Sequence, residues 1–349
     1  MTPAAKSSSS DSRTPDQWRA GAIRPATVSG GTQQSMLLYA IQRIGLSILI
    51  LLTSMVMLFT ALKFIPGDPA TIMLGSRASA EMKARITEQL GLNDPVIVQL
   101  GTFIGRLLQG NLGTDMWSQR PVSQMVLESM PYTLMLIAVG LGWAALIGIP
   151  LGCYSAVRRN SLIDRFTGVI SVGTISIPSF VVAIYLILLF AIALDWLPVI
   201  GAGDAGDWRD QAVHLIMPGF ALGLGWVGYL SRIVRASMLE VMGENHIRTA
   251  RAYGLPEFHI IRAYALRIAI LPTITLLAVA IGGLLSSAVF IEAIFARPGI
   301  GKLIVDAANM RNFPVVQGAV LSTVALFAMT MPLADLLVAW LDPRVRATL

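Results

Sequence analysis

The stretch SMPYTLMLIAVGLGWAALIGIPLGCYSAV, residues 129–157, contains no Asp, Glu, Lys or Arg. A helix rises 1.5 Å per residue, so about 20 residues cross the roughly 30 Å hydrocarbon core of a bilayer. Lipid offers no hydrogen-bond partners to backbone N–H and C=O groups, and a segment that crosses it must therefore be helical. The stretch predicts a transmembrane helix.

Five further charge-free runs have the length of a span. Together with the first, the six predicted spans are 44–62, 129–157, 166–194, 211–231, 268–291 and 312–334. The whole chain is 55% hydrophobic and 13% charged, which is typical of membrane proteins. Pro150, Pro178, Pro218 and Pro332 lie inside these runs, and we expect them to kink the helices rather than break them. The predicted fold class is an all-α polytopic membrane protein with six transmembrane helices.

The distribution of arginine between the connections predicts the orientation. The connection 158–165 carries three arginines and 232–267 carries six, whereas 195–210 carries one arginine and four aspartates. By the positive-inside rule the two basic connections lie in the cytoplasm. Both termini then also lie in the cytoplasm, and the segment 63–130 lies outside.

Two segments flank the first predicted span. Residues 1–35 are rich in Ser, Thr, Pro and Gly and cannot bury much apolar surface, so we expect a disordered cytoplasmic tail. The external segment 63–130 predicts two amphipathic helices. The first runs from a Ser79 cap to a stop at Gly91, and the second has Pro95 at its first position and stops at Gly110.

Two glycine pairs have the spacing of close helix contacts. Gly148 and Gly152 lie in one predicted span, and Gly219 and Gly223 lie in another. Small residues four positions apart allow helix backbones to approach. We favour packing within the chain, with a subunit interface as the alternative.

The sequence lacks the usual catalytic and cofactor motifs. PGIGKL at 298–303 is similar to part of a phosphate-binding loop, but Ala296 replaces the first glycine and Leu303 replaces the final Ser or Thr, so we expect an outer turn. The three histidines and the single Cys153 form no metal pattern, and no nucleophile elbow is present. We therefore expect no catalytic residue, no metal and no cofactor.

Ionisable residues are also nearly absent from the apolar runs. Glu292 and Asp335 lie at the ends of such runs. Proton-coupled carriers usually hold ionisable groups inside their spans. This argues against a proton-coupled secondary carrier.

The connection 232–267 contains ENHIRTARAYGLPEFHIIRAYALR at 244–267. We expect Asn245 to cap a short helix, Gly254 to end it in the left-handed conformation, and Pro256 to start a second helix. In the first helix, Ile247, Ala250 and Tyr253 recur at helical spacing. In the second, Phe258, Ile261 and Ala265 form an apolar stripe. The pattern fits either a docking element or a basic loop that only fixes topology.

This stretch resembles the cytoplasmic signature of the inner-membrane permease subunits of ATP-binding-cassette (ABC) importers, in the dipeptide, oligopeptide and nickel branch. That branch reads T-A-R-A-x-G-L, as residues 249–255 do here. Further matches in order are PGDPA, LGLNDPVIVQL, GNLG, SIPSF, VFIEAIFARPGIGKLIVDA, FPVVQGAV and LDPRVR, and the resemblance covers nearly all of 36–346. Tyr253, Tyr264 and Ile268 depart from the usual pattern.

The resemblance implies that residues 36–349 form one permease domain in the bacterial inner membrane. Its coupling helix would insert into a cytoplasmic ATPase. The implied ATPase-coupling residues are Glu244, Arg248, Thr249, Ala250, Arg251 and Gly254.

The implied partners are two ATP-binding-cassette ATPase subunits, a homologous second permease, a periplasmic or lipid-anchored substrate-binding protein, and membrane lipid; we expect no nucleic acid. The implied function is non-enzymatic import of di- or oligopeptides. The alternatives are a nickel or other small-solute importer of the same family, a secondary carrier, or a membrane scaffold.

Overall fold

The computed structural model describes residues 31–63, 81 and 94–341, and the regular elements in these ranges are helices. Five of them are long and apolar enough to cross a membrane. They are α2 (Gly31–Lys63), α6 (Val122–Val157), α9 (Trp208–Met242), α13 (Leu271–Ile294) and α15 (Phe313–Leu341). α7 (Leu162–Ser176) and the pair α8 (Ser179–Leu186) and η1 (Ile187–Ala193) are together long and apolar enough to count as a sixth, bent span. The predicted all-α fold with six spans is confirmed.

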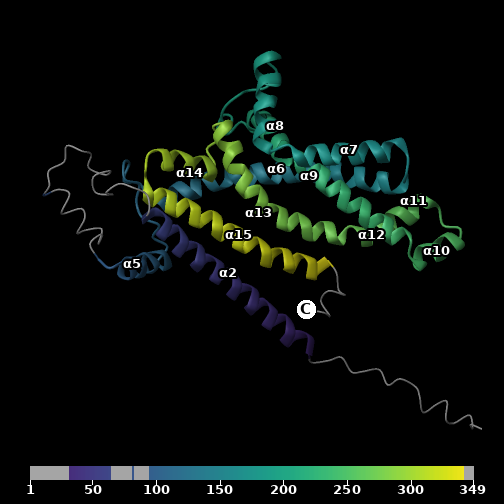
Figure 1. The fold of residues 1–349 in the computed structure, drawn as a ribbon, viewed down its shortest axis with the longest axis horizontal. Coiled ribbons are helices and arrows are strands. Elements are labelled where there is room, and N and C mark those ends of the chain that lie inside the picture. The colour runs from purple at the N-terminus through teal and green to yellow at the C-terminus, as the bar shows by residue number, and fades with distance from the viewer. Residues whose placement is uncertain (1–30, 64–80, 82–93, 342–349) are drawn as a thin grey trace, which may run out of the picture.

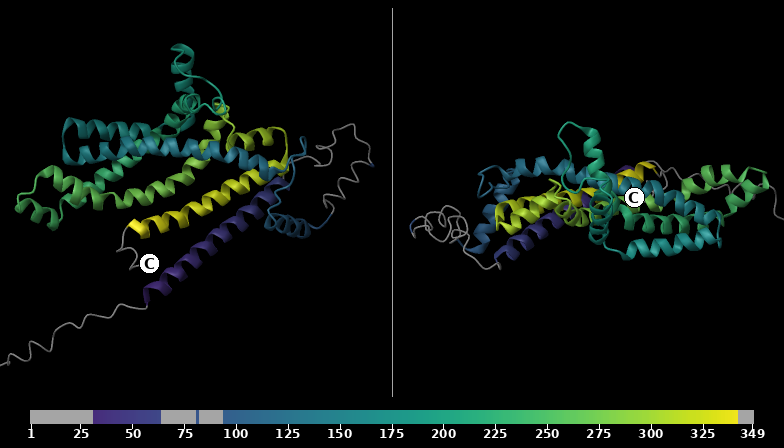
Figure 2. Two further views of the ribbon diagram at one scale, coloured as in Figure 1. Left: turned by 180° about the vertical axis from the view of Figure 1, so that it is seen from behind. Right: turned by 90° about the horizontal axis from the view of Figure 1, so that it is seen from above.

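The shorter helices lie at the two ends of the bundle (Figures 1 and 2). One end carries α10 (Asn245–Ala252), α11 (Glu257–His259) and the turn at 158–161 between α6 and α7. The short η2 (Ile260–Ala265) and α12 (Leu266–Ala269) lead from there into α13. The opposite end carries α5 (Val96–Leu108) and α14 (Ile300–Asn309). We call these the α10 end and the α14 end.

The third span is broken, and here the expectation for Pro178 is wrong. α7 and the α8–η1 pair meet at 96°. Ile177 is extended, with φ −92° and ψ 119°, because the ring of the following proline disfavours the helical conformation at that position. Pro178 then precedes the first residue of α8. The other three prolines, Pro150, Pro218 and Pro332, lie inside continuous helices as expected.

The segment boundaries also differ in places from the sequence-based expectations. Residues 1–30 and the predicted helix after Ser79 lie outside the described residues, apart from residue 81, whereas 31–35 belong to α2 and not to the predicted tail. Pro95 is the cap before α5 and not its first residue. Gly110 follows that helix with φ +74°, the left-handed conformation predicted for its stop.

All four predicted packing glycines lie where α6 meets α9, so the interpretation as packing within the chain is confirmed. A Cβ on Gly152 would lie 2.5 Å from the carbonyl oxygen of Ser231, and one on Gly148 would lie 2.9 Å from that of Val227. Further along, Trp143 Nε1 donates a 2.8 Å hydrogen bond to the carbonyl oxygen of Gly219. The two backbones are therefore in direct contact over several turns.

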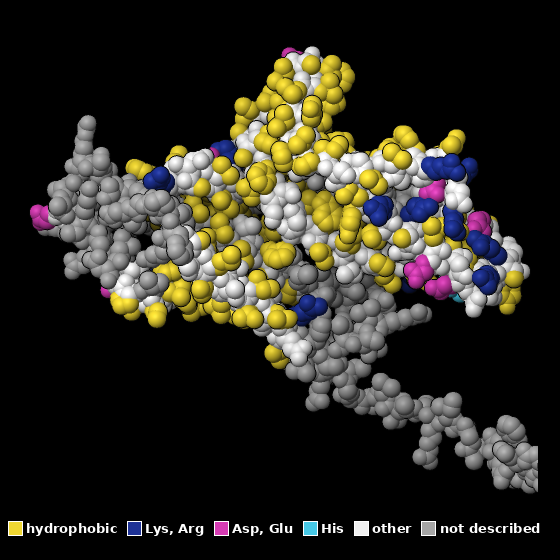
Figure 3. Space-filling view, in the orientation of Figure 1, with side chains coloured by type: hydrophobic (Ala, Val, Ile, Leu, Met, Phe, Trp, Pro, Cys, Tyr) yellow, Lys and Arg dark blue, Asp and Glu magenta, His cyan; other side chains and the backbone are white. Residues whose placement is uncertain are grey.

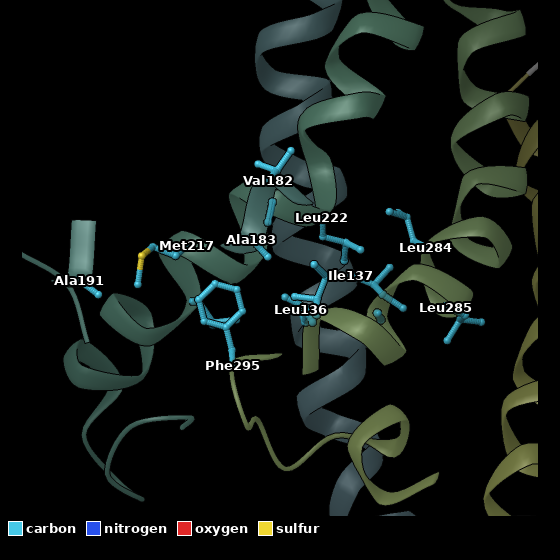
Figure 4. Close-up of a cluster of buried hydrophobic side chains, with 14 residues drawn as sticks. Leu136, Ile137, Val182, Ala183, Ala191, Met217, Leu222, Leu284, Leu285 and Phe295 are labelled. Atoms are coloured by element: carbon cyan, nitrogen blue, oxygen red, sulfur yellow. The ribbon is translucent and has the colours of Figure 1, made fainter. Parts of the chain in front are cut away.

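The largest buried cluster joins four of the helices. Leu136 from α6, Leu222 from α9 and Leu284 from α13 meet there, with Ala183 from α8 beside them (Figure 4). Phe295, just after α13, is also a buried member of this cluster. The broken span is thus held in the bundle by its second half as well as its first.

The α6–α9 contact predicts a sharp difference between two glycine substitutions. In Gly223→Ala the new Cβ would collide with the carbonyl oxygen of Gly140 and lie 2.5 Å from Trp143 Nε1. Overpacking of this kind lowers the free energy of unfolding by about 1–3 kcal/mol. The measurement is unfolding of the purified protein in detergent. The control is Gly142→Ala on α6, where nothing lies within 4 Å, and equal stability of the two variants would contradict the packing.

Candidate functional site

The connection between α9 and α13 folds into the predicted pair of short helices. Glu244, not Asn245, is the N-cap of α10, with φ −73° and ψ 158° and no side-chain hydrogen bond to the helix. Asn245 is the first helical residue, and its carbonyl oxygen accepts a 3.0 Å hydrogen bond from Thr249 Oγ1. Gly254 has φ +74°, the left-handed stop that the sequence predicts. No Cβ would clash there, so the requirement for glycine comes from the backbone alone.

One face of α10 packs against its own chain. Ile247 is fully buried and Ala250 is 5% exposed. They contact a cluster that includes Val234 and Met238 from α9 and Ala156 from the end of α6. Ala250, one of the six implied coupling residues, therefore seats α10 on the bundle and does not face outward.

The other five implied coupling residues are exposed: Glu244, Arg248, Thr249, Arg251 and Gly254. Two aromatic residues join them on the surface, with Tyr253 83% exposed and Phe258 73% exposed. The sequence set the spacing of these two residues but did not show whether their side chains are buried. Tyr253 is six residues from Ile247, about one and two-thirds helical turns, so the helical period could have placed it on a different side. Phe258 lies beyond the Gly254 stop, and no local signal gave its direction.

An ion pair closes the hinge between the two short helices. Arg251 Nη2 lies 2.6 Å from Glu257 Oε1, and Arg251 Nε lies 3.1 Å from Oε2. The hydrogen bonds from Arg251 hold the pKa of Glu257 below its ordinary value, so the carboxylate is ionised at neutral pH. Both side chains are exposed, and such pairs contribute little to stability. The pair shapes the hinge without holding the fold together.

Positive side chains gather at this end of the molecule. Figure 3 shows Lys and Arg side chains concentrated at the α10 end, whereas the sides of the bundle are largely apolar. The loop presents the exposed Arg248 and Arg251 together with the acidic Glu244 and Glu257, and the exposed Tyr253 and Phe258 lie in the same loop. Such a surface suits a partner protein better than hydrocarbon, because the charges would lose their hydration in lipid.

The PGIGKL segment at the α14 end has a structural explanation. The Glu292 carboxylate accepts hydrogen bonds from the backbone N–H groups of Gly301, at 2.7 Å, and Lys302, at 3.3 Å. Its other oxygen accepts a 2.6 Å bond from Thr133 Oγ1 on α6. A Cβ on Gly299 would overlap this carboxylate. The amides that a phosphate would use are therefore occupied by the protein's own side chain. The segment is not a turn throughout, because residues 300–303 form the start of α14.

The described residues contain no group of three or more His, Cys, Asp or Glu side chains placed to hold a metal ion. The α10 loop lies at one end of the helical bundle (Figure 1). Their combination, a polytopic helical bundle with a short basic helix at one end, can be compared with known proteins.

Two family descriptions cover most of the chain. Residues 148–347 match the "Binding-protein-dependent transport system inner membrane component", and residues 36–137 match the N-terminal region of such membrane components. The chain belongs to this family. This permease is 36% identical over 311 residues to the "Glutathione transport system permease protein GsiC" of Salmonella paratyphi A, covering 89% of this chain and 99% of the relative. The protein of the same name from Pectobacterium atrosepticum is 36% identical over 312 residues, with the same coverage.

A solved structure supports the fold. The permease resembles a chain of the MetNI methionine ABC transporter in an inward-facing conformation, with a TM-score of 0.51 and 16% identity. The match covers 63% of this chain and 97% of the other. The permease is a multi-pass inner-membrane subunit of an ABC importer of the peptide and nickel branch. ATP hydrolysis lies in separate ATPase subunits, and a substrate-binding protein is a further partner.

Proposed function

We propose that this permease imports peptides, with glutathione-like tripeptides as the first candidate class. The observation that carries the proposal is the 36% identity, over nearly the full length, to proteins named as glutathione permeases. The T-A-R-A-x-G-L reading at residues 249–255 resembles the peptide branch and adds support.

Reconstitution in proteoliposomes tests this substrate class. The permease is combined with its ATPases, its second permease and its substrate-binding protein, and uptake of labelled glutathione, a labelled dipeptide and Ni²⁺ is measured. We expect peptide uptake that requires both ATP and the binding protein. Uptake of Ni²⁺ without uptake of either peptide would contradict the proposal and favour the small-solute alternative.

The orientation that we propose puts the α10 end in the cytoplasm, with both termini inside and the α14 end outside. The support is the concentration of arginine at the α10 end and the positive-inside rule. The assembly that we propose contains a homologous second permease beside the two ATPases. The exposed apolar side chains of the α8–η1 pair, including Tyr185, Leu188 and Ile192, provide area for such a subunit.

Site-directed labelling checks the orientation. Cysteine is introduced into a Cys153→Ser background, once at Asn245 and once at Gln109. A membrane-impermeant thiol reagent should reach Asn245→Cys only from the cytoplasmic side and Gln109→Cys only from the outside. Outside labelling of Asn245→Cys would reverse the proposed orientation.

We further propose that the exposed surface of α10 and α11 docks on the ATPase, with Tyr253, directly after α10, and Phe258, in α11, as its apolar anchors. Aromatic side chains bury a large area and are enriched among the residues that dominate protein interfaces. The neighbouring Arg248 and Thr249 are exposed and would contribute polar contacts at the rim. A charge at Ala250 would be a poor test of docking, because that side chain is buried in its own chain and the variant would unseat α10.

Alanine substitution of the two aromatics tests the docking surface. We expect Tyr253→Ala and Phe258→Ala each to weaken ATPase binding about tenfold, which corresponds to about 1.4 kcal/mol. The measurement is the amount of ATPase that co-purifies with the permease over a concentration series.

Two controls accompany these variants. Phe166→Ala removes an aromatic ring that is 67% exposed on α7, and Glu257→Gln removes the exposed ion pair, so both should bind ATPase nearly normally. Undiminished ATPase binding by both Tyr253→Ala and Phe258→Ala would contradict the proposal that this surface docks on the ATPase.

A further inference from the structure

A buried carboxylate near the α10 end joins three segments of the chain. Asp164, in the first turn of α7, is 6% exposed. It accepts a hydrogen bond from Ser155 Oγ on α6 and a 2.9 Å bond from the backbone N–H of Asn160 in the connecting turn. From α9, Arg235 donates through Nε at 2.5 Å and through Nη2 at 2.8 Å. The ion pair is therefore a two-pronged one and links residues 71 positions apart.

Further along α7 from this pair, the helix contacts α9 through small and neutral groups. The hydroxyl oxygens of Ser171 and Ser231 lie 2.8 Å apart, and both side chains are buried. A Cβ on Gly228 would lie 2.6 Å from the carbonyl oxygen of Ser171. Close packing of this kind keeps the helices together, and the forked ion pair adds a contact that fixes both distance and orientation.

The same helix α9 leads directly into the coupling loop. Met238 and Val241, near its end, share a buried cluster with Ile247 and Ala250 of α10. A displacement of α10 therefore acts on α9 through packed side chains. α7 is the first half of the broken span. In the second half of that span, Val182 and Ala183 of α8 lie in the central cluster with Leu284 and Phe295 (Figure 4).

We propose that the Arg235–Asp164 pair is a positioning clamp, which makes α7 and the α8–η1 pair move with α9 when the coupling helix is displaced. The proposal rests on the proposed coupling role of α10. Asp164 is buried and bonded to Arg235, so in this proposal it acts through α9. Asp164 is buried, whereas the Arg235 side chain is 34% exposed, so the loss of Arg235 would leave a buried carboxylate without its charged partner.

Separate measurements of binding and transport test the clamp. Asp164→Asn keeps the shape of the side chain and removes its charge, whereas Arg235→Lys keeps the charge and loses the fork. We expect Asp164→Asn to retain bound ATPase and ATP hydrolysis, and its peptide uptake per ATP hydrolysed to fall at least tenfold, with an intermediate loss in Arg235→Lys. The labelled probe is glutathione, or the dipeptide if the uptake assay above accepts only that.

A matched control and a rescue distinguish positioning from mere folding. Glu128→Gln breaks the exposed Arg120–Glu128 pair, and it should leave uptake per ATP unchanged. In a Cys153→Ser, Asp164→Asn background, Ser171→Cys and Ser231→Cys place two thiols where the hydroxyls now touch. Oxidation to a disulfide should restore uptake per ATP, because it again ties α7 to α9.

Three outcomes would overturn the clamp. The first is that Asp164→Asn takes up peptide, per ATP hydrolysed, within twofold of the unsubstituted protein. The second is a loss of assembled complex that matches the loss of uptake, with uptake per ATP hydrolysed unchanged, which would show a structural role only. The third is a disulfide that forms without restoring uptake per ATP hydrolysed. Failure of the coupling proposal is distinguishable, because it appears as normal ATPase binding by Tyr253→Ala and Phe258→Ala.

Discussion

The direct contact between the backbones of α6 and α9 is the constraint on which the rest of the structure depends. Gly148 and Gly152 on one helix meet the carbonyl oxygens of Val227 and Ser231 on the other, with no room for a side chain. In lipid there is little hydrophobic drive between helices, so close packing and hydrogen bonds must hold them. With this pair fixed, α9 carries α10 at one end, and α7 and α13 pack against its sides.

Two buried carboxylates of this bundle are each surrounded by several hydrogen-bond donors. Asp164 receives bonds from two helices and a turn, and Glu292 receives bonds from Thr133 and from two amides at the start of α14. Both carboxylates sit near an end of the bundle and tie a connection to the helices. A buried carboxylate that accepts several hydrogen bonds thus links a connection to the helices at both the α10 end and the α14 end.

The α10 loop divides its residues between two tasks. Ile247 and Ala250 fix the helix to α9, and Tyr253 and Phe258 face away from the chain. A helix that is anchored on one face and exposed on the other can pass a displacement from a partner to the bundle. In the proposed clamp, the Asp164–Arg235 pair links α9 to the broken span, whose two halves meet at 96°.

Local features of the sequence determined the class of fold and the candidate loop. Charge-free runs gave the six spans because lipid admits only helices, and Gly254 marked the helix stop because its backbone conformation favours glycine. The order of family motifs gave the permease identity. Tertiary structure decided the burial of Ala250 and the outward direction of Phe258. It also decided the pairing of Asp164 with Arg235. These depend on which distant segment lies against each residue, and the periodicity of a single helix carries no information about its neighbours.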